Sequence, residues 1–445
     1  MASGLFTIAS SGLRAARAAL DVTSQNIANA NTEGYVRRSL SLAEVASAGG
    51  PGRIGDISLS GVRVSGLNRN ADLFRQAEVR RTTSDAQRAA TELKGMENAE
   101  AALEQANLFP AMTAFESALA RLSADPTDTS LRAAALEDAR TLTRTFTIAA
   151  QGLDTAGEGL RFEAADGVDQ VNLLATELAR VNLQLTRSGE GTSDQVNLLD
   201  KRDSLLQQLS AFADLSTSFA ADHTVEVRLG GSGGPQLVTG GSAAPLAMAT
   251  AADGTISFTL SSGAVTLGGG SLAGTTQALV GLRDTHDQLD AIAANLIATL
   301  NTAQSGGVAL DGSAGQPFLS GSDAASIALA LTSGNQIATA PSGAGAGSRD
   351  PANLEAMRSA LSGNDISGQI DGLLFTVSSA VAARRTTGDA LDAIAASARL
   401  ALDQQAGVDL DQEAVNLVRF QQAFQASGKA IQVAAELFDT LLALD

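Results

Sequence analysis

The 445-residue chain has no cysteine, no tryptophan, a single tyrosine (Tyr35) and two histidines. Without cysteine it can form neither disulfides nor thiolate metal sites. His223 and His286 are far apart in the sequence, and neither has a second ligand at metal-binding spacing. We therefore expect no metal and no other cofactor.

Basic residues are also scarce. The chain has 30 Lys and Arg against 48 Asp and Glu, a net charge of −18, and no basic run of five. Nucleic-acid binding depends on clustered Lys and Arg, so we predict no nucleic-acid partner. No run of apolar residues approaches the roughly 18 needed to span a bilayer. We expect no cleavable leader at the N-terminus, because Arg14 and Arg17 have no apolar segment after them. We predict no membrane insertion.

Catalytic patterns are absent except for one weak match. Residues 230–234, Gly-Gly-Ser-Gly-Gly, resemble the nucleophile turn of serine hydrolases. That turn requires a strand before it and a helix after it, whereas strand and loop patterns flank it here. Acidic pairs such as Asp200 and Asp203 are common on solvated helix faces. We predict that the chain is not an enzyme and keep a secreted hydrolase as a remote alternative.

What the sequence does contain is a heptad pattern at each end. Residues 3–29 predict an amphipathic helix with apolar positions spaced alternately by three and four. The members of this N-terminal stripe are Phe6, Ala9, Leu13, Ala16, Leu20, Thr23 and Ile27. Gly34 then ends the regular structure, inside an asparagine-rich turn.

The C-terminal end repeats the three-four spacing. Its stripe comprises Leu410, Glu413, Leu417, Phe420, Phe424, Ser427, Ile431, Ala434, Phe438 and Leu441. Two of these positions, Glu413 and Ser427, are polar, so the stripe is imperfect. Either stripe alone is typical of a surface helix on a core. Matching stripes at both ends indicate that the termini meet each other or meet the same partner.

Between the ends, alternating residues between 39 and 67 predict a small hairpin, with its turn at Gly49–Gly52. Helices are predicted over 71–107, 111–123, 128–152, 167–186 and 193–213, with a break at Pro110. A glycine-rich alternating region then predicts an inserted antiparallel β domain over about 219–274. Helices return at 279–302, 353–361 and 371–404. The segment 333–349 is low in complexity, and we predict that it is mobile.

The fold class predicted is mainly α, with nested, discontinuous domains and the terminal helices paired as a coiled-coil-like layer. Residues 1–37 and 408–445 are predicted to form a terminal assembly domain. Residues 38–218 and 275–407 would form a helical bundle that carries the hairpin, and 219–274 the inserted β domain.

The first 38 residues carry a specific resemblance. The stretches 11–16 (Ser-Gly-Leu-Arg-Ala-Ala), 20–22 (Leu-Asp-Val) and 26–35 (Asn-Ile-Ala-Asn-Ala-Asn-Thr-Glu-Gly-Tyr) are similar to the N-terminal signature of flagellar rod, hook and hook-associated proteins. On this resemblance Asn26, Asn29, Gly34 and Tyr35 join the N-terminal stripe as candidate assembly residues.

Other segments resemble the hook-associated members that join hook to filament. They include 407–413 (Gly-Val-Asp-Leu-Asp-Gln-Glu), 419–422 (Arg-Phe-Gln-Gln) and 198–203 (Leu-Leu-Asp-Lys-Arg-Asp). The resemblance implies a structural subunit that assembles through its terminal helices at the hook–filament junction. A hook or distal rod protein is the nearest alternative. Longer relatives carry an outer domain that this chain is predicted to lack.

The resemblance also implies partners and a location. The partners are copies of the chain in a ring, hook protein, the next hook-associated junction protein on the filament side, and a cytosolic export chaperone on the C-terminal helix. The location implied is extracellular, on the flagellum, after export through the flagellar type III system without a cleaved signal.

Overall fold

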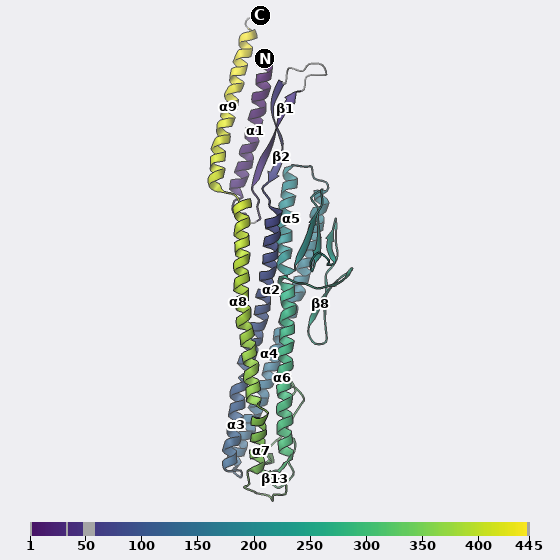
Figure 1. Ribbon diagram of the computed structural model, residues 1–445, viewed down its shortest axis with the longest axis vertical. Coiled ribbons are helices and arrows are strands. Elements are labelled where there is room, and N and C mark those ends of the chain that lie inside the picture. The colour runs from purple at the N-terminus through teal and green to yellow at the C-terminus, as the bar shows by residue number, and fades with distance from the viewer. Residues whose placement is uncertain (1, 33, 48–57, 443–445) are drawn as a thin grey trace.

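The computed structural model describes residues 2–32, 34–47 and 58–442 and shows an elongated molecule. A long helical shaft occupies most of its length, and a smaller group of elements extends beyond one end of the shaft (Figure 1). Both chain termini lie at that end, at the tips of the first and last helices. The predicted nested arrangement, in which the chain leaves through helices and returns through helices, is confirmed.

The shaft is built from α2 (Leu73–Ala106), α3 (Leu108–Ala124), α4 (Thr129–Leu185), α5 (Ser193–Phe212), α6 (Gly270–Ser305), α7 (Ala352–Gly363) and α8 (Ile366–Ala406). Its core is rich in alanine and leucine, with a few fully buried phenylalanines such as Phe115 and Phe146. Phe115 meets Phe318 edge-to-face, with ring centroids 5.9 Å apart. Small side chains allow these helices to pack closely over a long distance.

α4 is one uninterrupted helix of 57 residues, where the sequence pattern predicted two. The glycines that favoured a break are contact points instead. A Cβ atom at Gly152 would be 2.9 Å from Ala102 Cβ, and one at Gly167 would be 3.0 Å from Leu272 Cδ2. Close packing against α2 and α6 therefore compensates for the low helix propensity of glycine.

The break predicted at Pro110 occurs three residues earlier. Asn107 ends α2 in the left-handed conformation, with φ of 56°, and α3 begins at Leu108. Pro110 lies in the first turn of α3, where a missing backbone N–H costs nothing. The helix thus ends at a residue that tolerates positive φ.

The inserted β structure has two antiparallel sheets beside the shaft. The first contains β3 (Leu215–Phe219), β4 (Val225–Leu229), β5 (Gln236–Thr239) and β6 (Ser242–Ala243), and the second β7 (Ala247–Thr250), β8 (Ile256–Leu260) and β9 (Gly263–Val265). α6 begins at Gly270, nine residues before its predicted start. Gly270 has φ of +80°, and a Cβ there would be 2.2 Å from Ala213 N, so only glycine lets α6 start against the end of α5.

The far end of the shaft is closed by ordered loops with short strands: β10 (Gly307–Val308), β11 (Leu319–Ser320), β12 (Ala328–Leu329), the 3₁₀ turn η1 (Gly334–Gln336) and β13 (Ala340–Pro341). The prediction that 333–349 is mobile is wrong for its first half, because Ile337, Ala338 and Thr339 are buried. The fully buried Arg132 of α4 donates hydrogen bonds to the carbonyls of Gly334 and Ile337 at 3.2 and 2.9 Å. One arginine thus fixes the segment.

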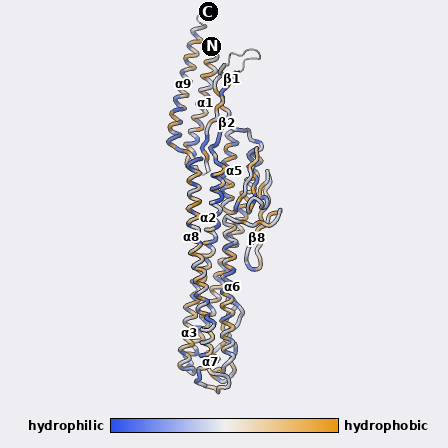
Figure 2. The backbone as a smooth tube through the Cα atoms, viewed as in Figure 1, coloured by the Kyte–Doolittle hydropathy of each residue, from blue (hydrophilic) through white to orange (hydrophobic). Residues whose placement is uncertain are grey.

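Beyond the other end of the shaft lie α1 (Ala2–Ala28), the antiparallel hairpin of β1 (Arg38–Ser47) and β2 (Ser58–Arg69), and α9 (Leu410–Leu442), which we call the terminal module. The hairpin was grouped with the bundle from the sequence; here it packs mainly on α1. Its predicted turn at Gly49–Gly52 lies outside the described residues. Figure 2 shows hydrophobic residues along α1 and α9 although both helices stand clear of the shaft.

One helical stretch, within Ala352–Thr440, contains a window apolar and long enough to cross a membrane by length and composition alone. This window differs from the sequence expectation, which considered only unbroken apolar runs. The stretch is divided between α7, α8 and α9, and 28% of the window is buried inside the molecule.

Candidate assembly interface

α1 and α9 pack against each other as an antiparallel pair, as the matching stripes predicted (Figure 1). Small residues set the distance between them. A Cβ atom at Gly12 would be 3.1 Å from Ser427 Oγ, and one at Gly428 would be 4.0 Å from Leu13 Cδ1. The polar stripe position Ser427 therefore marks a close approach of the helices rather than a defect.

The predicted N-terminal residues divide by burial. Ala9, Ala16 and Asn26 are buried; Leu13, Leu20, Asn29 and Tyr35 are half-buried; Phe6, Ile27 and Gly34 are exposed. The structure thus brings the small members of the stripe together with α9 and the hairpin. It leaves the large ones at the margins, available to other chains.

The predicted C-terminal residues divide in the same way. Ala434 is buried; Leu417, Phe420 and Ile431 are half-buried; Leu410, Phe424 and Phe438 are exposed. The side chain of Leu441 lies outside the described residues. Among the described apolar members of the stripe, Ala434 alone is buried within one chain, so most of the apolar area of this stripe is still open.

α1 has a second buried face that the heptad analysis missed. Ala15, Ala19 and Val22 are buried on it, against the hairpin. Ser11 Oγ accepts a hydrogen bond from Val62 N at 3.1 Å, and a Cβ at the neighbouring Gly61 would be 2.1 Å from that oxygen. The signal was weak because alanine and serine do not mark a face as leucine does.

α9 carries a second apolar set that was also missed. Val415, Val418, Val433 and Leu437 are all exposed, Val415 by 68%. With about 100° of rotation per residue, the three valines lie on the side of α9 away from the predicted stripe, whereas Leu437 lies at the margin of the stripe, beside Phe438. Such a side cannot be satisfied by α1 and is typical of a helix that is covered from two directions.

The terminal module meets the shaft at one joint, where three segments of the chain lie together. Arg37 N donates to Ala406 O at 2.9 Å, and Asn70 Nδ2 donates to Gln405 O at 2.6 Å. Arg37 also forms an ion pair with Glu413, at 2.7 Å between Nε and Oε1. Glu413 is buried, so the second polar position of the C-terminal stripe is the anchor of α9.

The hydrogen bonds of Asn26 explain why the N-terminal signature has an asparagine at this position. Its amide donates to Arg38 O at 2.8 Å and accepts from Arg38 N at 3.0 Å. Its oxygen also accepts from the Tyr35 hydroxyl at 2.9 Å. The Arg38 guanidinium lies over the Tyr35 ring, 4.8 Å from the centroid. One buried amide therefore fixes where the chain leaves α1 and enters β1.

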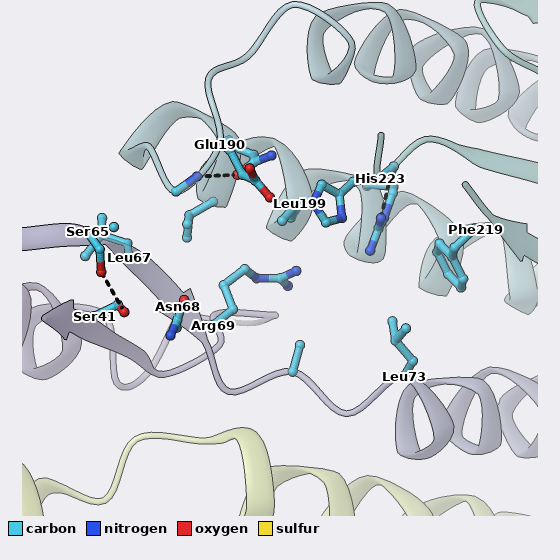
Figure 3. Close-up of a pocket in the computed structure, with 16 residues that line it drawn as sticks. Ser41, Ser65, Leu67, Asn68, Arg69, Leu73, Glu190, Leu199, Phe219 and His223 are labelled. Carbon is cyan, nitrogen blue, oxygen red and sulfur yellow. Dashed lines mark hydrogen bonds between the residues drawn. The ribbon is translucent and has the colours of Figure 1, made fainter. Parts of the chain in front are cut away.

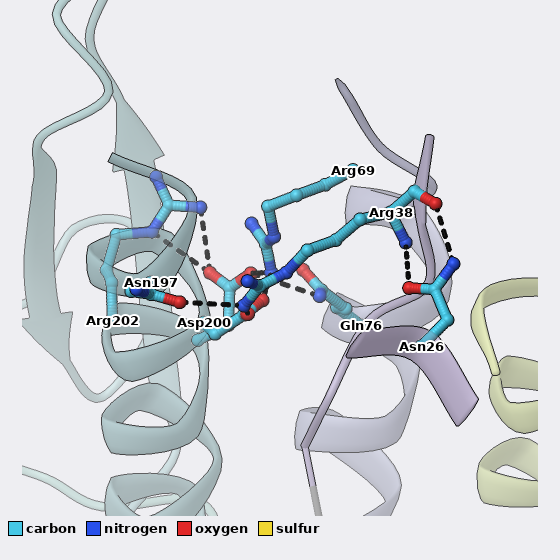
Figure 4. A network of polar contacts seen from close by, with 8 residues as sticks. Asn26, Arg38, Arg69, Gln76, Asn197, Asp200 and Arg202 are labelled. Carbon is cyan, nitrogen blue, oxygen red and sulfur yellow. Dashed lines mark hydrogen bonds and ion pairs between the residues drawn. The ribbon is translucent and has the colours of Figure 1, made fainter. Parts of the chain in front are cut away.

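Arg38 continues into a buried ionic network that joins the hairpin to α5 (Figure 4). Asp200 lies 2.6 Å from Arg38 and 2.8 Å from Arg69. Asp203 lies 2.8 Å from Arg69 and 2.7 Å from Arg202, and it accepts a hydrogen bond from Gln76 at 3.1 Å. The acidic pair that resembled a solvated helix face is thus the attachment of the terminal module to the shaft.

The pKa values of Asp200 and Asp203 shift in opposite directions, because burial and the neighbouring arginines act on each carboxylate with different strength. Burial raises the pKa of Asp200 above its ordinary value, and Arg69 and Arg38 offset this only in part. Burial also pushes the pKa of Asp203 upward, but Arg202 and Arg69 outweigh it and hold that pKa below its ordinary value. Asp203 is therefore the carboxylate whose charge the folded network stabilises.

A pocket of about 700 Å³ lies beside this network, between β2, α5 and the loop at Gly191 (Figure 3). Arg69 and Arg202 line it, but both are already paired with Asp203. His223, on its wall, accepts a hydrogen bond from Arg202 Nη1 through its carbonyl oxygen at 2.7 Å. These polar groups hold the joint and the first β sheet together.

The structure bears on two kinds of chemical site, a metal site and a hydrolase nucleophile. In the described part of the chain no cluster of three His, Asp or Glu could hold a metal ion. The Gly230–Gly234 turn connects β4 to β5, so a strand rather than a helix follows it. The nucleophile turn of hydrolases requires a helix at that place, which removes the observation on which the hydrolase alternative depended.

Comparison with known proteins first places the two ends. Residues 6–35 match the family model "Flagella basal body rod protein", and residues 403–444 match "Flagellar basal body rod FlgEFG protein C-terminal". The two end helices of the terminal module thus match families of flagellar basal body rod proteins. Residues 93–319, just over half of the chain, match "Flagellar hook-associated protein FlgK helical domain". The chain belongs to the FlgK family of flagellar hook-associated proteins.

Individual relatives agree with this placement. The chain is 31% identical over 250 residues to flagellar hook-associated protein 1 of Salmonella typhimurium, covering 55% of this chain and 44% of that protein. It is 30% identical over 251 residues to the Escherichia coli protein of the same name, covering 55% and 45%. The match therefore spans less than half the length of these curated relatives.

A solved structure shares the fold. The flagellar hook junction protein FlgK from Burkholderia pseudomallei superposes with a TM-score of 0.50 at 22% identity, covering 55% of this chain and 46% of that chain. The match of the helical domain, rather than of the ends alone, decides between the predicted alternatives in favour of a hook-associated protein over a hook or rod protein.

Proposed function

We propose that this chain is a structural subunit of the bacterial flagellum that forms the junction between hook and filament. The observation that carries the proposal is the terminal module. It pairs the first and last helices outside the shaft and still exposes large apolar residues on both. Full burial of a Leu or Phe contributes roughly 1.5–3 kcal/mol, and because these side chains are about half exposed, as Phe6 is by 50% and Phe438 by 53%, neighbouring copies would supply about half of that for each.

In this proposal, residues 1–37 and 408–445 are the assembly domain, and the remainder is an outer layer of helical bundle and β domain. The partners are further copies in a ring, hook protein on one side and the next hook-associated junction protein on the other. An export chaperone would cover α9 before assembly, since α9 has apolar residues on two sides. The role is mechanical and involves no catalysis.

The proposed location is outside the cell, after export through the flagellar type III system with no cleaved signal. Because the paired helices join the shaft at one joint, they can unfold, pass through the export channel as an extended chain and pair again afterwards. Secretion that persisted in cells without a working flagellar export apparatus would argue against this route.

The experiment that tests the function is deletion of the gene. We expect cells that build hooks of normal length, carry no filaments and release unpolymerised flagellin into the medium. Expression of the full chain from a plasmid should restore attached filaments. Filaments of normal number in the deletion strain would overturn the proposal.

A further inference from the structure

Two helices of the shaft, α4 and α8, each expose a line of large apolar residues to solvent. On α4 these are Ile148, Phe162 and Leu173, and Phe162 is 77% exposed. On α8 they are Phe375, at 72%, and Leu400, whereas Ile394 is exposed about 100° around the helix from this line. Most phenylalanines of a soluble protein are largely covered, so two exposed to this degree indicate a contact surface. We call these sets the α4 stripe and the α8 stripe.

The two stripes have the same length. Ile148 and Leu173 are 25 positions apart, and so are Phe375 and Leu400. In an α-helix this separation is about 37 Å, and it returns the second residue to nearly the same side as the first. Each stripe is therefore a straight line with an apolar residue at either end.

The contacts of α4 and α8 with α2 show that the two stripes lie at the same height along the shaft. In an antiparallel helix pair, residues at the same height along the axis have residue numbers with a nearly constant sum. Contacts of α4 with α2 join Gly152 to Ala102 and Glu163 to Lys94, which gives sums of 254 and 257. Contacts of α8 with α2 join Arg384 to Glu92, Ser378 to Glu100 and Arg385 to Glu97, with sums of 476, 478 and 482. Ile148 and Phe375 thus lie within about one helical turn of each other along the shaft. The same holds for Leu173 and Leu400.

The stripes lie on opposite sides of the shaft. The α8 contacts of α2 are Glu92, Glu97 and Glu100, and its α4 contacts are Lys94, Gly95 and Ala102. With about 100° per residue, these two sets project from opposite sides of α2. Each stripe also faces away from the buried side of its own helix. One molecule can therefore present one stripe to each of two neighbours.

The residues just before the two first anchors carry opposite charges. Further along, α8 has the exposed Asp389 at the place equivalent to Phe162 of α4, 14 residues after the first anchor, with the small exposed residues Thr386 and Ala393 on either side of it. Four residues before its first anchor, α4 carries the exposed Arg144, and α8 carries the exposed Asp371 at the equivalent place. Neither charge forms an ion pair with another described residue. Arg144 of one copy and Asp371 of the next can therefore form a pair of opposite charges.

We propose that the α8 stripe of one copy packs on the α4 stripe of the next copy around the ring. Such a contact uses two different surfaces of one chain, so it propagates from copy to copy and closes only through symmetry. This inference rests on the proposed function. A stripe about 37 Å long and one helix wide covers roughly 400 Å², about half of what each partner buries in a stable pair. The contact would therefore add to the terminal interface and would not hold free molecules together.

The test uses the absence of cysteine from the chain. The double variant Ile148→Cys/Phe375→Cys would be expressed in the deletion strain, and hook–filament complexes would be isolated and oxidised. Because cysteines form a disulfide only when their Cα atoms are within about 7 Å, the bond requires the stripes to face each other. We expect a ladder of dimers, trimers and larger covalent multimers, and the same ladder from Leu173→Cys/Leu400→Cys.

The matched control is Leu173→Cys/Phe375→Cys, which uses the same stripes out of register by about 37 Å and should remain monomeric. Monomers from both in-register variants, in complexes that contain the chain, would overturn this inference and leave the proposed function standing. Dimers from Phe375→Cys alone would also overturn it, since α8 would then face α8. An adduct with hook or filament subunits would overturn it as well, when Phe375→Cys carries a maleimide–benzophenone crosslinker, which joins the thiol to a nearby C–H bond on illumination. Absence of the chain from the isolated complexes would overturn the proposed function itself.

Discussion

Replacing Arg132 by methionine is expected to lower the free energy of unfolding by at least about 3 kcal/mol, because several buried acceptors lose their donor at once. Arg132 donates to Pro126 O at 2.6 Å and to Thr339 Oγ1 at 2.7 Å, besides the carbonyls of Gly334 and Ile337. Burial lowers the pKa of this arginine, and no carboxylate in the described part of the chain pairs with it. It acts as a hydrogen-bond hub for the distal loops.

Calorimetric unfolding and amide hydrogen exchange would measure the effect. Exchange should accelerate most at residues 334–340, where the loop loses its attachment to α4. Arg140→Met is the matched control, since it removes the same group from an exposed position of the same helix and should change stability by less than about 0.5 kcal/mol. Equal effects of the two substitutions would show that the buried arginine does not hold the distal loops.

The second large effect is expected at the joint. Asp203→Asn should cost about 3–5 kcal/mol, since it leaves Arg202 buried without its carboxylate partner and Arg69 with Asp200 alone. Asp200→Asn should cost much less, because burial already disfavours the charged form of that carboxylate. Thermal unfolding of the two variants beside the unchanged chain compares neighbouring carboxylates of one network, so each serves as the control for the other.

The pH dependence has a definite sign. The pKa of Asp203 is lower in the folded state, so its stabilising contribution is present above the unfolded value of about 3.9 and is lost as the pH falls through the lower folded value. The stability difference between the unchanged chain and Asp203→Asn should therefore shrink below about pH 4. For Asp200 the raised pKa has the opposite sign, with stability lost as the pH rises through the folded value. A larger cost for Asp200→Asn than for Asp203→Asn at pH 7 would contradict this description of the joint.

The terminal helices and their pairing could be predicted because a heptad pattern states which side of a helix is apolar. The same pattern could not show which residues would be covered within one chain. Ala434 is buried and Phe438 is exposed although both belong to one stripe. What separates them is the position of α1, and that position depends on the hairpin and on Gly12.

Contacts between distant segments account for the errors. The low complexity of 333–349 favoured mobility, but a buried arginine 200 positions earlier supplies the donors that order its first half. The glycines of α4 favoured two helices until α2 and α6 were seen to pack against them. Asp200 and Asp203 looked like surface charges because their arginine partners at 38 and 69 are remote in sequence. Sequence patterns report local preference, and these outcomes depend on which partner is nearby.

In the proposed function, contact between the two end helices is what attaches a filament to its hook. Electron microscopy of deletion-strain cells that express Ala434→Arg tests it most directly, since this change puts a charged side chain where α9 is fully covered. The account predicts secreted protein and bare hooks, whereas Ala434→Ser, which stays small, should support filaments. Normal filaments on cells carrying Ala434→Arg would contradict it.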